Sequence, residues 1–161
     1  MTRPDAPTWD STPAQFRRSE ITATIGHGDD DFARAAHDVL RWAVKTRSGF
    51  AVSSDGPATS GQRLVVTAGL AGVTVREPVQ VLDVVRSAER VGFSYRALPG
   101  HPVRGEEAFV VHRDGAAVLL TIRSLTRPAP GGPWRWAFPL LLVAQRVARA
   151  RYVRALRRPD R

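Results

Sequence analysis

The chain has 161 residues, the size of one domain, and it contains no cysteine. Disulfides, thiolate metal sites and cysteine nucleophiles are therefore excluded. We expect a soluble, cytoplasmic protein, because the N-terminus lacks an apolar signal segment and the longest apolar run, residues 136–144, is far shorter than the roughly 20 residues of a membrane-spanning helix.

The formal net charge of +9 is concentrated at the C-terminal end of the chain. Residues 134–161 carry eight arginines and a single acidic residue, whereas the remainder of the chain is nearly neutral. We favour a solvated helix face for this segment. An anionic membrane surface is the alternative partner, and the nearly neutral body of the chain argues against nucleic acid.

The first part of the chain predicts an arm, a strand and a helix in succession. Residues 1–18 are rich in Pro and Thr and lack periodicity, which is typical of an arm on the surface. Residues 19–27 alternate apolar and polar side chains like a half-buried strand. Residues 29–46 show an apolar stripe at helical spacing that includes Trp42, which we interpret as a core residue. Residues 53–61 have the composition of a loop.

The second part predicts antiparallel strands followed by a long helix. Two hairpins are expected, one around the SAER segment at residues 87–90 and one around the two-residue turn Asp114-Gly115. The expected strands are residues 63–75 (one strand, or two broken near Gly69 and Gly72), 78–86, 91–98, 106–113 and 116–126. The expected helix spans about residues 138–157, with Leu141, Ala148, Tyr152 and Leu156 on one arc and Arg151, Arg154 and Arg158 on the other.

This element order predicts an α+β fold in which a curved antiparallel sheet grips a long C-terminal helix. In its element order the chain resembles the helix-grip, or START-like, fold, which leaves a cavity between the sheet and the helix. We expect a single domain over residues 19–158, preceded by the arm.

The second hairpin separates two adjacent carboxylates. With a two-residue loop, Phe109 lies opposite Leu120 on the apolar, inward face, and Glu106 lies opposite Arg123 on the outward face. This expected ion pair accounts for Glu106. Glu107 points inward with no evident partner, and burying a carboxylate without a partner is costly. Glu107 is therefore the stronger site candidate.

The first hairpin adds inward side chains to the same surface. Its register is weaker, and it places Phe93 opposite Val84 and Tyr95 opposite Leu82. The phenol of Tyr95 needs a hydrogen-bond partner in such a position. Tyr95 and Glu107 are then either an acid/base pair or two groups that satisfy each other inside the sheet.

Residues 99–105, between the two hairpins, contain the remaining candidates. His101 lies between Gly100 and Pro102, and we favour a turn with a solvent-facing ring over a general base. Arg104 is expected at the mouth of the same surface. No helical HExxH motif or spaced His pair is present, so neither a metal nor a cofactor is expected.

Residues 92–107, GFSYRALPGHPVRGEE, resemble the central motif of an uncharacterised bacterial and plant family, UPF0548, which carries the domain of unknown function DUF1990. Supporting matches are IRSLTRP at residues 122–128 and ARYVRAL at residues 150–156. The chain departs from the family motif at residues 96–97, where the family usually has Gly-Thr, and at Val103, where it usually has Glu. The resemblance implies a compact helix-and-sheet domain without an established activity, so it assigns no catalytic residue.

Three functions are compatible with these observations. We favour a domain that binds a small apolar or amphipathic molecule between the sheet and the helix. Its expected contacts are Tyr95, His101, Glu107, Phe93, Phe109, Trp42 and Arg104. The second function is a cyclase- or hydrolase-type enzyme with Glu107 or His101 as general base and Tyr95 as donor. The third is an interaction module whose arginine-rich helix binds nucleic acid or anionic lipid.

Overall fold

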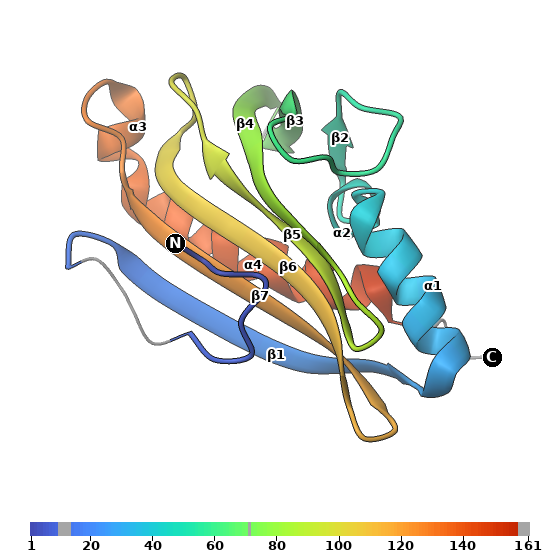
Figure 1. Cartoon of the computed structure of the whole chain (residues 1–161). Coiled ribbons are helices and arrows are strands. Elements are labelled where there is room, and N and C mark those ends of the chain that lie inside the picture. Colours follow the sequence, from blue (N-terminus) through green and yellow to red (C-terminus); the bar gives the residue numbers. More distant parts are fainter. Residues whose placement is uncertain (10–13, 71, 158–161) are drawn as a thin grey trace.

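Seven antiparallel strands form one sheet in the computed structural model, which describes residues 1–9, 14–70 and 72–157. The strands are β1 Arg17–His27, β2 Phe50–Val52, β3 Arg63–Leu70, β4 Val73–Arg86, β5 Arg90–Ala97, β6 Val103–Asp114 and β7 Ala117–Pro128. The helices are α1 Gly28–Leu40, α2 Ala43–Thr46, α3 Pro133–Trp136 and α4 Phe138–Leu156. The strand order is β1-β7-β6-β5-β4-β3-β2. The sheet curves around α4, and α1 lies at one end of it (Figure 1), which confirms the expected α+β architecture.

The β6–β7 hairpin turns one residue later than the sequence predicts. Asp114 pairs with Ala117, so each residue of β6 meets a residue two positions further along β7 than expected. Because side chains alternate across a strand, a shift of two leaves every face unchanged, and the expected inward face is correct. The expected pairing of Glu106 with Arg123 is wrong, since Glu106 lies opposite Leu125.

The β4–β5 hairpin confirms one expected pair and corrects another. Val84 lies opposite Phe93, as predicted. A register shift between Val81 and Val84 then places Tyr95 opposite Val81 rather than Leu82. An extra residue of this kind bends a strand and increases its twist. The bend helps the sheet to curve around the interior, and Tyr95 remains buried there.

The helix expected over residues 29–46 is broken at Trp42. α1 ends at Leu40, and Trp42 adopts a left-handed backbone with a φ of 63° before α2 begins. This conformation costs roughly 1–2 kcal/mol for a residue with a side chain. Burial offsets the cost, because Trp42 is 1 % exposed and its ring centroid lies 4.4 Å from that of Phe93. Trp42 is thus a core residue, as expected, and the break is followed by a buried Lys45.

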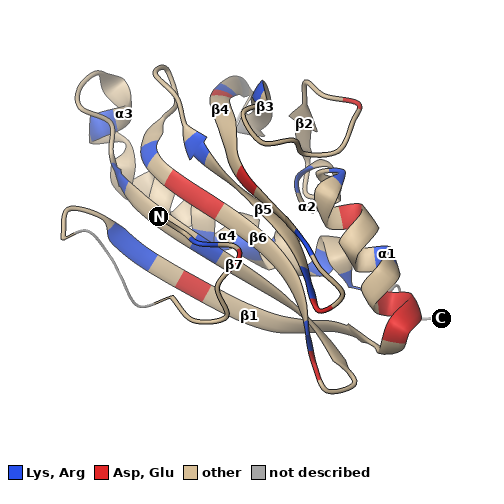
Figure 2. Ribbon diagram, in the orientation of Figure 1, with Lys and Arg blue, Asp and Glu red and all other residues tan. Residues whose placement is uncertain are grey.

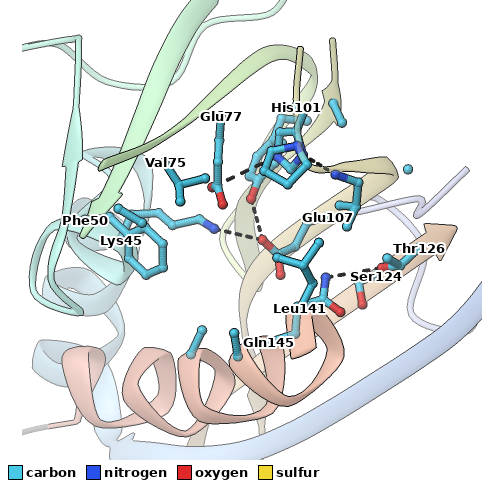
Figure 3. Close-up of a pocket in the computed structure, with 18 of the residues that line it drawn as sticks. Lys45, Phe50, Val75, Glu77, His101, Glu107, Ser124, Thr126, Leu141 and Gln145 are labelled. Carbon is cyan, nitrogen blue, oxygen red and sulfur yellow. Dashed lines mark hydrogen bonds and ion pairs between the residues drawn. The ribbon is translucent and has the colours of Figure 1, made fainter. Parts of the chain in front are cut away.

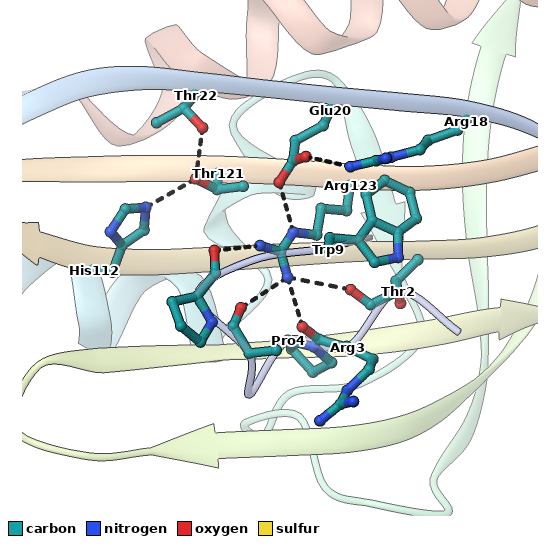
Figure 4. Close-up of polar contacts among 12 residues, drawn as sticks. Thr2, Arg3, Pro4, Trp9, Arg18, Glu20, Thr22, His112, Thr121 and Arg123 are labelled. Carbon is teal, nitrogen blue, oxygen red and sulfur yellow. Dashed lines mark hydrogen bonds and ion pairs between the residues drawn. The ribbon is translucent and has the colours of Figure 1, made fainter. Parts of the chain in front are cut away.

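The described part of the N-terminal arm lies across the outer face of the sheet, where Arg123 of β7 holds it (Figure 4). The guanidinium of Arg123 pairs with Glu20 of β1 at 2.8 Å. Its other acceptors are the backbone carbonyls of Arg3, Ala6 and Pro7, at 2.7–2.9 Å. The N–H of Thr2 donates to Glu106 at 2.9 Å. The arm therefore covers the part of the outer face around Arg123, and Arg123 binds the arm rather than Glu106.

One side of the C-terminal region presents apolar side chains to solvent. Trp136 of α3 and Leu140, Val143 and Val147 of α4 are each between 49 % and 86 % exposed. Within the described residues, no helix is long and apolar enough to cross a membrane. Arg158, expected on the arginine arc of this helix, lies outside the described residues.

Candidate functional site

A cavity of about 350 Å³ lies between the concave face of the sheet and α4 (Figure 3). Its apolar wall includes Phe50, Ala68, Val75, Leu141, Ala144 and Ala148. Its polar wall includes Lys45, Glu77, Tyr95, His101, Glu107 and Tyr152. The cavity reaches the surface along α4, because the half-exposed Val147 also lines it.

The structure brings three of the seven candidate contacts to this cavity: Tyr95, His101 and Glu107. Trp42, Phe93 and Phe109 do not line it but form the packed core beside it. The ring of Phe93 contacts the other two, with centroid distances of 4.4 Å to Trp42 and 5.8 Å to Phe109. Arg104 is exposed and does not line the cavity.

Lys45 of α2 is the central polar group of the site, although the sequence did not single it out. Its ammonium donates hydrogen bonds to Glu107 Oε2 at 3.0 Å and to the Tyr152 hydroxyl at 2.7 Å. It also lies 5.0 Å from the ring centroid of Phe50 and 5.4 Å from that of Phe109, within reach of cation–π attraction. Only 2 % of Lys45 is exposed, so its charge must be compensated inside the protein.

Glu107 of β6 supplies that compensation. The Tyr95 hydroxyl donates to the same carboxylate oxygen that accepts from Lys45. Burial raises the pKa of Glu107, but Lys45 and the hydrogen bond from Tyr95 outweigh burial and hold this pKa below its usual value. Burial lowers the pKa of Lys45, but the Glu107 carboxylate and the other groups around Lys45 together raise it by more, so the pKa of Lys45 lies well above its usual value. The two groups therefore form an ion pair at neutral pH.

The two tyrosines of the site keep their protons. Burial raises the pKa of Tyr95 well above its usual value, and the Glu107 carboxylate raises it further. Burial also raises the pKa of Tyr152, against the opposing effect of Lys45. Each phenol is therefore a neutral hydrogen-bond donor, and that of Tyr95 is committed to Glu107.

His101 lines the cavity with a largely buried ring instead of facing solvent. Its Nδ1 accepts a hydrogen bond from the N–H of Val103 at 3.1 Å, and its Nε2 lies 4.0 Å from Glu77 Oε2. Burial, reinforced by Lys45, lowers the pKa of His101 to about 4. The ring is neutral at pH 7, with its proton on Nε2, because Nδ1 acts as the acceptor.

Glu77 of β4 is a second carboxylate that the sequence did not identify. Burial raises the pKa of Glu77, although Lys45 opposes that effect. The predicted strand boundary between residues 75 and 78 concealed it, whereas β4 runs unbroken from Val73 to Arg86. The alternation of Val75, Glu77 and Val79 on one face was the signal that could have found it.

The site shows no metal-binding arrangement among the described residues, where no three His, Asp or Glu side chains are grouped to hold an ion. Its two strongest charges neutralise each other, and a neutral imidazole and two neutral phenols surround them. The arrangement can therefore offer hydrogen bonds to a neutral group beside an apolar wall.

Comparisons with known proteins agree with this architecture. The family model described as "Domain of unknown function (DUF1990)" matches residues 3–155. A UPF0548 protein from Deinococcus radiodurans is 44 % identical over 79 residues, which are 48 % of this chain and 39 % of that relative. The chain thus aligns with about two fifths of the relative's length.

Solved structures with the same fold have distant sequences. A hypothetical protein from Helicobacter pylori has a TM-score of 0.62 and 13 % identity, covering 97 % of this chain and 96 % of its own. The Zhui aromatase/cyclase from Streptomyces sp. R1128 has a TM-score of 0.59 and 17 % identity, covering 86 % and 91 %. A major latex-like protein from Panax ginseng has a TM-score of 0.50 and 14 % identity, covering 86 % and 99 %. At these identities the likeness concerns the fold alone, and it confirms the helix-grip arrangement.

Proposed function

The chain belongs to the DUF1990 family, whose description assigns no activity, and we propose that it binds a small apolar or amphipathic molecule in the cavity between the sheet and α4. The observation that carries this proposal is the cavity itself. A volume of about 350 Å³ falls in the range of ligand pockets, and apolar walls with a few fixed polar groups are typical of them.

The chemistry of the polar groups supports binding over acid–base catalysis. A general base works best when its pKa lies near the operating pH. Lys45 holds the pKa of Glu107 low, and burial holds that of His101 near 4, so both are weak bases at neutral pH. The Tyr95 hydroxyl already donates a hydrogen bond to Glu107 and keeps its proton. The cyclase- or hydrolase-type alternative would need a ligand that rearranges these contacts.

Native mass spectrometry of the purified protein, searched for a co-purifying molecule, is the first test. The second is titration with the neutral fluorophore N-phenyl-1-naphthylamine, which we expect to bind the wild type. Ala144→Phe fills the cavity from α4 and should abolish binding, whereas Ala150→Phe on the exposed side of α4 should leave it unchanged. Equal binding by both variants would place the probe outside the cavity and contradict the proposal.

A second candidate function is contact with an anionic membrane surface through α3 and α4. The apolar stripe formed by Trp136, Leu140, Val143 and Val147 lies in a segment whose charged side chains are almost all arginines. Apolar side chains beside basic ones are typical of helices that lie in a bilayer interface. This stripe also reaches the cavity mouth at Val147.

Vesicle flotation tests the membrane candidate. The protein should float with vesicles of phosphatidylglycerol and phosphatidylcholine and not with phosphatidylcholine alone. The double variant Trp136→Ser and Leu140→Ser should weaken flotation because it loses apolar contact with the bilayer. The double variant Arg151→Ala and Arg154→Ala should weaken it because it loses attraction to the anionic lipid. Flotation that survives both pairs of substitutions, or that ignores lipid charge, would remove this candidate.

A further inference from the structure

A second, smaller cavity of about 190 Å³ lies between α4 and the edge of the sheet formed by β1 and β7. It is lined by Arg17, Arg18, Ser19, Thr126, Leu142, Gln145, Arg146 and Arg149. Half of these residues are arginines, and none is acidic. Figure 2 shows the basic residues at the start of β1 and along α4.

Three of the four guanidinium groups are available to this cavity. Arg18 is committed to the outer face of the sheet, where it pairs with Glu20 at 3.0 Å and lies over the ring of Trp9. Arg17 points to the opposite face from Arg18, and it shares that inner face with Ile21, which packs against the core. On α4, Arg146 and Arg149 are three residues apart and therefore neighbours on the helix surface.

None of these three arginines forms an ion pair with a carboxylate among the described residues, although the charge of Arg149 contributes to the lowered pKa of Glu107. Arg149 donates to the Ser124 hydroxyl at 2.6 Å, and Arg17 and Arg146 form no ion pair there. Elsewhere in the described chain, arginines such as Arg34 and Arg47 do form ion pairs. Like charges repel when gathered in one pocket, and an anion relieves that repulsion. Guanidinium groups bind phosphate and carboxylate through paired, charge-assisted hydrogen bonds.

The two cavities share a wall. Thr126 and Gln145 line both of them, and Gln145 Nε2 donates to Thr126 Oγ1 at 3.3 Å between the two (Figure 3). The hydrogen bond from Arg149 to Ser124 also joins the walls of the two cavities, because Arg149 lines the smaller cavity and Ser124 lines the larger one. A molecule that displaced these two hydrogen bonds could occupy both cavities at once.

Lys45 does not compete with the arginines for a negative charge. Its ammonium is already neutralised by Glu107 at 3.0 Å, deep in the larger cavity. A negative group placed there would face the carboxylates of Glu107 and Glu77. Arg151 of α4 also lines the larger cavity, so the charges of the site favour an anionic ligand whose charge points toward α4 and the β1 edge.

We propose that the ligand is an amphiphile with an anionic head group, whose phosphate or carboxylate is bound by Arg17, Arg146 and Arg149 while its apolar part occupies the larger cavity. This inference rests on the proposed function, because it specifies the ligand of that cavity.

Displacement of N-phenyl-1-naphthylamine by octyl phosphate, octanoate and octanol tests the head-group site at about 0.15 M salt, where exposed charges are partly screened. The two anions should bind about tenfold or more tightly than octanol, as expected for charge-assisted hydrogen bonds. Comparison of octyl phosphate with octanoate then separates a phosphate preference from a carboxylate preference. Either preference supports the proposal.

The triple variant Arg17→Gln, Arg146→Gln and Arg149→Gln should reduce the anion preference to about threefold or less and leave octanol binding unchanged. The matched control is Arg154→Gln, since Arg154 lies on the same helix and lines neither cavity. Circular dichroism confirms that the variants remain folded. A single Arg146→Gln variant should show a smaller loss in the same direction if the triple variant unfolds.

Two results would overturn the inference while the proposed function stands. One is equal affinity for octanol and octyl phosphate. The other is an anion preference that the arginine substitutions do not change. If the neutral probe fails to bind, the proposed function is contradicted, and calorimetric titration with octyl phosphate then decides the head-group site directly. If octyl phosphate binds no more tightly than inorganic phosphate, its octyl chain adds no affinity, and this result would also overturn the joint occupancy of the two cavities.

Discussion

Replacing Lys45 with methionine removes the cation from a buried ion pair and leaves the rest of its side-chain volume in place. The side chain of Lys45 is 3 % exposed and that of Glu107 is 13 % exposed, so the carboxylate that remains is largely buried without its ion-pair partner. Breaking a buried pair from one side costs about 3–5 kcal/mol, and we expect Lys45→Met to lower the free energy of unfolding by that amount at pH 7.

The loss should depend on pH, because the orphaned carboxylate can take up a proton. Without Lys45, burial is the dominant influence on the pKa of Glu107, and this pKa then lies above its value in the unfolded chain. A group whose pKa is higher in the folded state than in the unfolded chain contributes stability that is lost as the pH rises through the folded-state pKa. Lys45→Met should therefore be less destabilising at pH 5 than at pH 7.

Urea unfolding followed by tryptophan fluorescence measures both effects. Glu107→Gln and the double variant complete a cycle, in which the double variant should lose less stability than the two single variants together. Arg47→Met is the matched control, since Arg47 pairs with Asp38 at 2.7 Å while half exposed, and such a pair contributes about 0–1 kcal/mol. Equal losses for Lys45→Met and Arg47→Met, with no dependence on pH, would refute this account of the ion pair.

Three further predictions follow from the same structure. The pKa of His101 is about 4 in the folded protein, against 6.5 for the free side chain. Between pH 6.5 and 4 the wild type should therefore lose about 2–3 kcal/mol of stability relative to His101→Gln, and parallel urea-unfolding profiles of the two proteins would contradict this. Arg123→Lys keeps the charge but loses the planar set of donors, so limited proteolysis of the arm should accelerate, and an unchanged rate would remove Arg123 as its anchor. Gly105→Ala would place a Cβ 1.7 Å from the Leu125 carbonyl oxygen, and thermal unfolding should show a loss of stability of about 3 kcal/mol or more. Gly115→Ala, where no atom lies near the added Cβ, should lose about 1 kcal/mol, and equal losses for the two variants would contradict this.

The strand faces could be predicted because alternation of side chains survives small errors in register. The β6–β7 turn lies one residue later than expected, yet Glu107 and Phe109 still point inward, since the pairing shifts by two. Tyr95 remains inward for a similar reason, despite the bulge in β4. The partner of Glu106 could not be predicted, because a cross-strand partner depends on the register itself.

The centre of the site could not be predicted, because it depends on one break in the backbone. In an unbroken helix over residues 29–46, Lys45 lies off the apolar stripe that contains Val39 and Trp42. The left-handed conformation of Trp42 reorients α2, and Lys45 then meets Glu107. No local sequence pattern marks a tryptophan for this conformation. The second cavity was equally hidden, because it joins residues from β1 and α4 that only the tertiary structure brings together.

The arm on the outer face contacts strands that are made long after it. The contact of Thr2 with Glu106 spans 104 positions, and the contact of Arg123 with Arg3 spans 120. A ribosome makes the arm before its anchors, so the arm has no surface to cover until β7 has emerged. Contacts of such long range form late and slow folding. The arm is thus made before the strands that hold it and becomes ordered after them, and until then the outer faces of β6 and β7 are open to other chains.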